Sequence, residues 1–170
     1  MTSRRDFIAV SSAWIVAGPR AASLAQPQDA GSAEDTLRSE FLLDLTLDAK
    51  RPTTIGFPGG ERSIVSVTGG TFQGPRLRGT IAPGGGDWIV QRPDGSRVLD
   101  VRIVMTTDDQ QQIYVTWRGI AFTDNGALTA RIVPVFETGS AKYAWLNRVV
   151  SVGVYRPQAG TIGYRVFRIL

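Results

Sequence analysis

The stretch RVLDVRIVM at residues 97–105, followed by QIYVTWRG at residues 112–119, decides the fold of this 170-residue chain. In the first segment the odd positions from 99 to 105 are all apolar, whereas Asp100 and Arg102 share the other face. The second segment alternates in the same way, with Ile113, Val115 and Trp117 opposite Tyr114, Thr116 and Arg118. Because successive side chains of a strand point to opposite faces, this period of two predicts two-faced β-strands.

Turn signals separate these and the other apolar runs of strand length. Asp94-Gly95 and Asn125-Gly126 predict hairpins, because these residues tolerate the positive φ of tight turns. About nine such strands predict a meander that forms a barrel or a sandwich, and we favour the barrel because closure hides strand edges. We therefore expect an all-β fold, a single antiparallel β-barrel-like domain at residues 40–170.

The N-terminus has the features of an export signal. SRRDFI at residues 3–8 resembles the twin-arginine motif, and a small-residue cleavage site ends at Ala25. The apolar stretch at residues 7–17 is shorter than the ~20 residues of a membrane span, so no stable membrane insertion is expected. We predict a signal peptide at residues 1–25, a flexible leader at residues 26–39, and a periplasmic or secreted protein exported by the twin-arginine machinery. A Sec-type signal and an ordinary N-terminal helix are the alternatives.

The chain has no cysteine and no histidine. This excludes disulfides, Ser-His-Asp and Cys-His catalysis and the usual zinc ligands, so neither a metal site nor a cofactor is expected. Removing residues 1–25 takes away three of the 19 Lys and Arg and one of the 15 Asp and Glu, which lowers the net charge from +4 to +2. So small a positive charge disfavours a nucleic-acid partner.

Two pairs of neighbouring polar residues are candidates for chemistry. Asp87 and Trp88 follow the glycines of residues 83–86 and could bind a polar, ring-bearing ligand. Alternatively, Asp87 caps that turn and Trp88 belongs to the core. Asp100 and Arg102 project from one face of a strand. If that face is the barrel interior they could bind a substrate; if it is the exterior they are a solvated pair.

Further candidates lie elsewhere on the strands and near the C-terminus. Tyr114 could donate a proton, and Arg76 and Arg78 could bind a carboxylate or phosphate, although a structural tyrosine and exterior arginines are the alternatives. The remaining polar and aromatic candidates are Glu137, Tyr143, Trp145 and Asn147. An amide beside aromatic rings is typical of a small-molecule pocket, with Trp145 as a barrel plug as the alternative.

Six ordered motifs carry a resemblance to a known family. They are GGTFQGPRLRG (69–79), PGGGDW (83–88), RPDGSRVLDVR (92–102), IYV (113–115), FETG (136–139) and KYAWLN (142–147). Together they resemble the family called domain of unknown function 3237, also uncharacterised protein family 0311. The resemblance implies a β-barrel-like domain and no established biochemical role. That family usually has glycine where Gln110 stands, so a looser hairpin is predicted here.

These observations support two main functional hypotheses. The first is an exported barrel that binds a small molecule in its interior. The second is a cofactor-free acid/base enzyme, an isomerase, cyclase or lyase, with Asp87 or Asp100 as the base and Tyr114 or an arginine stabilising developing negative charge. A purely structural or partner-binding barrel is a third reading, and self-association is left open. Which strand faces line the interior distinguishes these hypotheses.

Overall fold

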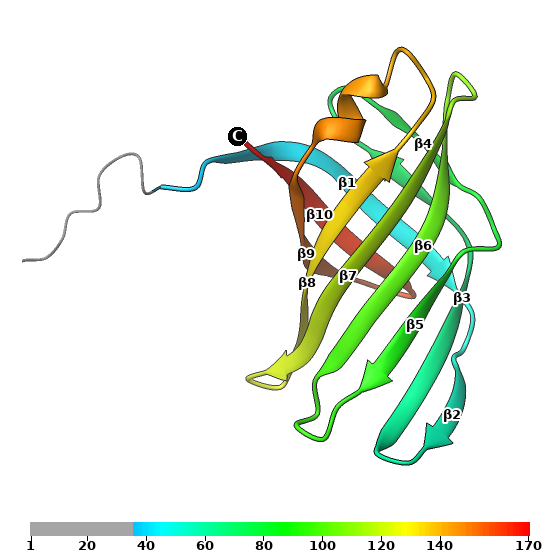
Figure 1. Ribbon diagram of the computed structural model, residues 1–170, viewed down its shortest axis with the longest axis vertical. Coiled ribbons are helices and arrows are strands. Elements are labelled where there is room, and N and C mark those ends of the chain that lie inside the picture. The colour runs from blue at the N-terminus through cyan, green and yellow to red at the C-terminus, as the bar shows by residue number, and fades with distance from the viewer. Residues whose placement is uncertain (1–35) are drawn as a thin grey trace, which may run out of the picture.

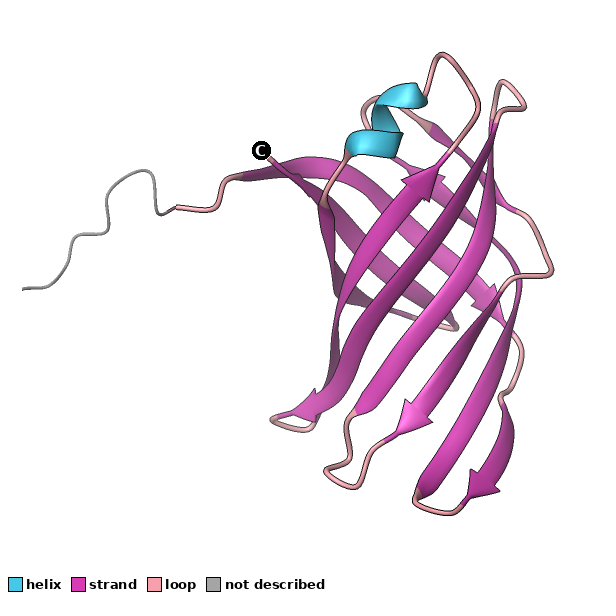
Figure 2. Ribbon diagram, in the orientation of Figure 1, coloured by secondary structure: helices cyan, strands magenta, loops and turns pink. Residues whose placement is uncertain are grey.

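The computed structural model describes residues 36–170, and the predicted signal peptide and most of the leader lie outside them. Ten strands and one short 3-10 helix make up this part of the chain (Figures 1 and 2). The elements are β1 Ser39–Ala49, β2 Thr53–Phe57, β3 Gly60–Gln73, β4 Arg78–Ile81, β5 Gly86–Gln91, β6 Arg97–Thr107, β7 Gln112–Asp124, β8 Ala127–Glu137, η2 Ala144–Arg148, β9 Ser151–Gln158 and β10 Thr161–Ile169. The predicted all-β class is confirmed.

The sheet closes into an antiparallel barrel. Strands β6 to β10 pair in sequence order, β10 pairs with β1, and β1 pairs back with β3. The short strands β4 and β5 both lie between β3 and β6, so they share one of eight positions around the ring. Strand β2 pairs with the start of β3 alone and extends the wall beyond the ring. The sequence predicted about nine strands, and the structure has ten.

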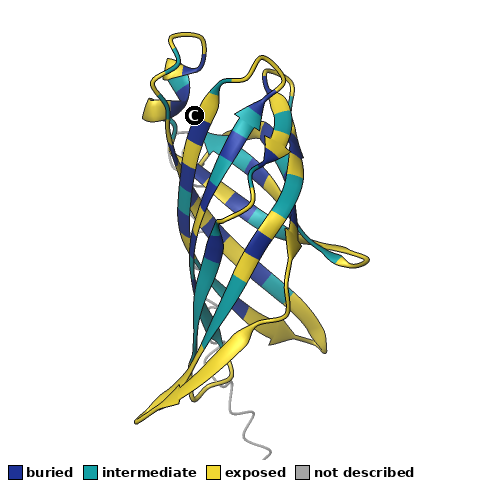
Figure 3. Cartoon of the chain, turned by 90° about the vertical axis from the view of Figure 1, so that its right-hand side faces the viewer, coloured by how far each residue is buried: buried dark blue, intermediate teal, exposed yellow. Residues whose placement is uncertain are grey.

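The period of two is visible along the strands as alternating buried and exposed bands (Figure 3). In β6 and β7 the odd-numbered residues point inward, and Ile103, Ile113 and Val115 are at most 1 % exposed. In β8 the inward residues are even-numbered, such as Ile132 and Phe136. The apolar faces of all the long strands therefore meet in one core, whose burial is the main favourable term in folding.

Two hairpins show how turn chemistry sets the register. Asn125 and Gly126 have φ values of 48° and 79°, as their sequence predicted. The β6–β7 turn is also tight, because Gln110 takes a φ of 60° and its N–H donates to the Thr107 carbonyl at 2.8 Å. The prediction of a looser hairpin was therefore wrong: Gln110 adopts the left-handed conformation that glycine takes more easily.

The two ends of the barrel differ. Helix η2 lies over one end, where Leu146, Tyr143 and Leu77 are buried against the core (Figure 1). The β2–β3 hairpin projects from the opposite end (Figure 1). In the described part of the chain, no helix is long and apolar enough to cross a bilayer. Because the residues beneath η2 are buried against the core, they plug that end of the barrel.

Candidate functional site

A cavity of about 110 Å³ lies inside the barrel, away from the η2 plug. Inward-facing side chains from eight strands surround it, and most are apolar, such as Leu47, Leu99 and Val101. The two small side chains Ala121 and Ala130 are paired across β7 and β8 and leave room on that wall. A mostly apolar cavity with a few polar groups is the usual form of a small-molecule site.

Asp87 supplies the cavity with a carboxyl group. The β5–β6 ladder is interrupted between the pairs Asp87–Val101 and Val90–Val98, and in this gap the Asp100 N–H donates to Asp87 Oδ1 at 3.0 Å. Burial raises the pKa of Asp87 to about 6, against the lowering effect of that hydrogen bond. The charge of Asp100 raises this pKa further, and Arg97 lowers it. Asp87 therefore changes its protonation state near neutral pH.

Three aromatic residues form one side of the cavity. Tyr164 packs edge-on against Trp117, with ring centroids 5.9 Å apart, and against Tyr155 at 5.8 Å. Burial, followed by the charge of Asp87, raises the pKa of Tyr164, so its phenol stays neutral and can donate. The Trp117 Nε1–H is buried and has no hydrogen-bond partner within residues 36–170. The Trp117 side chain lines the cavity, and its buried, unpaired N–H costs stability.

An open pocket of about 670 Å³ adjoins the cavity on the side away from η2, and we call it the mouth. Five residues line both spaces: Leu47, Val65, Ile89, Arg97 and Ile162. The rest of the mouth comes from the end of β1 and its connection to β2, from β2, β3 and β5, and from the β9–β10 turn. These shared residues place the mouth directly beside the cavity.

The structure decides between the readings left open for Asp100 and Arg102. Both lie on the outer wall, where Asp100 pairs with Arg102 at 3.4 Å and with Arg118 at 3.8 Å. The odd residues of β6 fill the core, so the even ones must face out. Tyr114 is 38 % exposed on the same wall. An acid/base pair of Asp100 and Tyr114 inside the barrel is therefore ruled out.

Three of the predicted residues do come together, but outside the barrel. Trp88, Arg102 and Tyr114 line an outer groove of about 520 Å³. The guanidinium carbon of Arg102 lies 5.2 Å from the Trp88 ring centroid, within range of a cation–π contact. Asp87 and Trp88 are neighbours on one strand and point to opposite sides of the wall, so they do not act on one ligand.

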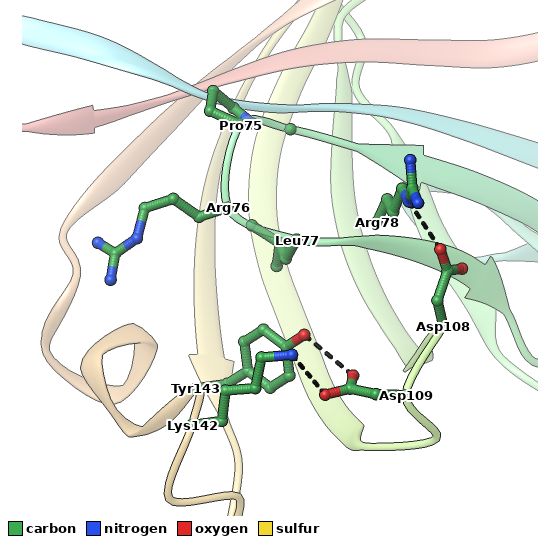
Figure 4. A pocket seen from close by; sticks show the side chains of 9 residues that line it. Pro75, Arg76, Leu77, Arg78, Asp108, Asp109, Lys142 and Tyr143 are labelled. Atoms are coloured by element: carbon green, nitrogen blue, oxygen red, sulfur yellow. Dashed lines mark hydrogen bonds and ion pairs between the residues drawn. The ribbon is translucent and has the colours of Figure 1, made fainter.

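Three other predicted residues, Arg76, Arg78 and Tyr143, line a pocket of about 320 Å³ at the plugged end (Figure 4). Arg78 on its rim pairs with Asp108 at 2.7 Å, and Lys142 pairs with Asp109 at 2.6 Å. Lys142, followed by the Thr107 hydroxyl, keeps the pKa of Asp109 below its usual value. These ion pairs tie the β6–β7 turn to the start of β4 and to the segment before η2.

Trp145, Asn147 and Glu137 also lie away from the cavity. The Arg76 guanidinium stacks 3.9 Å from the Trp145 ring centroid. Asn147 accepts from the Thr138 N–H at 2.8 Å and donates to the Thr138 carbonyl at 2.9 Å. Its amide therefore fastens η2 to the end of β8. Glu137 is exposed at that end of β8.

Sequence reasoning missed Arg97, Tyr155 and Tyr164 as cavity residues. Arg97 has the same odd parity as Leu99 and Val101, and Tyr164 the same even parity as Val166. Parity could have placed both side chains inside. Arg97 directly follows the turn at residues 93–96, and Tyr164 is next to the charged Arg165. These neighbours made both residues look like surface positions.

Comparisons with known proteins agree with this architecture. The family model described as protein of unknown function (DUF3237) matches residues 37–169. A UPF0311 protein of Clostridium acetobutylicum is 31 % identical over 129 residues, covering 66 % of this chain and 82 % of that protein. The crystal structure of a β-barrel-like protein from Acinetobacter baumannii is 28 % identical with a TM-score of 0.75, and the match covers 79 % of this chain and 97 % of that one.

One similar protein has a name that states an activity. A hydroalkoxylation enzyme of Penicillium herquei is 30 % identical over 92 residues. The match covers 54 % of this chain and 56 % of that enzyme.

Proposed function

This chain belongs to the DUF3237 family of proteins of unknown function, and we propose that its barrel interior binds a small, mainly apolar organic molecule. The observation that carries the proposal is the unfilled cavity of about 110 Å³ beneath an open mouth. Protein interiors are normally close-packed, so an internal cavity of this size costs stability when it is empty. A bound ligand recovers that loss.

The size of the cavity limits what it holds. An apolar cavity of ~150 Å³ is large enough for benzene. The space of about 110 Å³ takes a smaller group, such as a short alkyl chain or part of a ring, and the remainder of the ligand occupies the mouth.

Filling the cavity tests this proposal. Ala121→Leu places a larger side chain in the cavity, and Thr116→Leu makes a matched change on the outer wall of the same strand. We expect toluene and indole to perturb the NMR signals of cavity residues in the native chain and in Thr116→Leu, and to bind at least tenfold more weakly to Ala121→Leu. Native mass spectrometry of protein from its own host extends the search to natural ligands. Absence of binding by both probes together with absence of a co-purified ligand contradicts the proposal.

A second candidate function is acid/base catalysis in the same cavity. The observation that favours it is the pKa of Asp87 near 6, since a general acid works best with a pKa near the working pH. The name of the similar Penicillium herquei protein points to one such reaction. In a hydroalkoxylation the acid gives its proton to one alkene carbon, the alcohol oxygen bonds to the other, and the alcohol proton returns to the carboxylate. This cycle needs no cofactor.

Asp87→Asn tests the catalytic candidate. It keeps an acceptor oxygen for the Asp100 N–H and removes the transferable proton. With 2-allylphenol as the probe, we expect cyclisation by the native chain to fall as the pH rises through about 6, where the Asp87 carboxyl loses its proton. The variant should have no activity above buffer and should still bind toluene. Activity that survives in Asp87→Asn contradicts the assignment.

We also propose that the protein acts outside the cytoplasm, in the periplasm or beyond. The support is the sequence of residues 1–25. Replacing both Arg4 and Arg5 by lysine should keep the protein in the cytoplasmic fraction if export uses the twin-arginine route. Unchanged export of that variant contradicts the route, and a cytoplasmic native chain contradicts export.

A further inference from the structure

The mouth of the cavity carries three cationic side chains. Lys50 and Arg51 follow β1, at the connection to β2, and Arg97 begins β6. Glu61 is the acidic member of the mouth lining. Asp87 lies deeper, among the residues of the inner cavity. The mouth therefore has an excess of positive charge around its opening.

None of these three cations is paired within the described chain. The ion pairs found in residues 36–170 use other cations, namely Arg78, Arg102, Arg118, Lys142, Arg165 and Arg168. Most of these pairs are on exposed surface, where partners are easily gained and lost. At the mouth, by contrast, three cations lie together beside one carboxylate. Such a cluster is free to meet an anion from solution.

Arg97 connects this charge to the apolar interior. It is partly buried and lines both the mouth and the cavity. Four apolar residues line both spaces with it: Leu47, Val65, Ile89 and Ile162. A molecule that extends from the cavity into the mouth thus passes an apolar wall and ends beside a guanidinium.

We propose that the ligand is an amphipathic organic anion, with its apolar end in the cavity and its carboxylate or phosphate at the mouth. This inference rests on the proposed function, because it specifies the ligand of the same cavity. Arginine binds either group through paired, charge-assisted hydrogen bonds. Lys50 and Arg51 add attraction at longer range and guide the anion to the opening. The apolar end alone fits the inner cavity, so the ligand has one orientation.

Matched probes test the charge requirement on the full chain. 4-Phenylbutanoate and 4-phenylbutanamide have nearly the same shape and differ in charge, and 2-phenylethyl phosphate replaces the carboxylate by a phosphate. By calorimetry at low salt, we expect the acid to bind about tenfold more tightly than the amide. In 1 M NaCl, where the Debye length is ~3 Å, that difference should shrink. The phosphate arm identifies which of the two anionic groups the mouth prefers.

Substitutions locate the effect. Arg97→Gln, and the double change Lys50→Gln with Arg51→Gln, should lower the affinity for the acid more than the affinity for the amide, so that the difference between the two probes shrinks. Arg118→Gln removes the same charge from an outer-wall residue whose side chain is 82 % exposed, and should change neither affinity. Far-UV circular dichroism and the urea unfolding midpoint report that each variant is folded.

The outcomes separate this inference from the proposed function. Equal binding of acid and amide to the native chain overturns the anion inference and leaves the cavity proposal standing. A preference for the acid that is unchanged both in Arg97→Gln and in the double variant of Lys50 and Arg51 overturns the inference as well, because the anion then binds elsewhere. Failure of every probe, neutral and charged, overturns both proposals.

Discussion

Replacing Asp87 by asparagine should make the protein more stable at neutral pH and change how its stability depends on pH. In the folded state the pKa of Asp87 is raised from 3.8 to about 6, mainly by burial. A carboxyl whose pKa is higher when folded favours the folded state in its protonated form. Its stabilising effect is complete below pH 3.8 and is lost as the pH rises to about 6.

The magnitude follows from the size of the shift. A change of about 2 pKa units corresponds to at most about 3 kcal/mol, at 1.36 kcal/mol per unit. Asparagine has no charge to bury and still accepts from the Asp100 N–H. We therefore expect Asp87→Asn to gain up to about 3 kcal/mol over the native chain between pH 4 and pH 7.5. Urea unfolding at four or five pH values measures this difference.

Asp94 provides a control of opposite sign. Its pKa is lowered by hydrogen bonds from the Ser96 hydroxyl and N–H. Asp94→Asn should therefore lose stability relative to the native chain as the pH rises from the lowered Asp94 pKa to 3.8, and the difference should stay constant at higher pH. If the difference between Asp87→Asn and the native chain does not vary with pH, or has the sign expected of Asp94, then the cavity does not desolvate the Asp87 carboxyl as the structure indicates.

Three further substitutions test local features by thermal or urea unfolding. Gln110→Gly should stabilise the protein by about 1 kcal/mol, because a left-handed φ of 60° costs a residue with a side chain more than glycine; a loss of stability contradicts this. Ser151→Ala should lower the free energy of unfolding by about 1–3 kcal/mol, because the buried Ser151 hydroxyl donates to the Pro134 carbonyl at 2.8 Å and alanine removes that donor. An unchanged free energy of unfolding implies that water replaces the hydroxyl. Asn147→Ala should lower the free energy of unfolding by about 1–2 kcal/mol, because it removes two hydrogen bonds to Thr138. Toluene binding should stay unchanged, and weaker toluene binding would place Asn147 in a ligand site.

The fold was predictable because its main signal is local. Alternation in residues 97–105 and 112–119 places Val101 and Trp117 on one side of their strands, and both are buried as that pattern indicates. The Asn125-Gly126 hairpin is equally local, since two neighbouring residues set the φ values that the turn requires. Helix η2 was missed because its five residues are too few to show a helical period.

The candidate site was harder to predict because its polar groups are brought together only by closure of the sheet. Asp87, Arg97 and Tyr164 come from three strands, and Arg97 and Tyr164 are far apart in sequence. The sequence analysis named Asp87 as a candidate, but it gave equal standing to Asp100 and Tyr114, which lie on the outer wall. Local spacing reports which residues share a face. It does not report which distant residues meet across the interior.

The plug formed by η2 makes the barrel a cup instead of a tube. Leu146 is completely buried beneath that end, and the space described above opens on the other side. A ligand that enters the cavity through the mouth must therefore leave through the mouth as well. The part of the ligand that enters first is then the last part to leave. The product of any reaction in the cup must leave before the next substrate arrives.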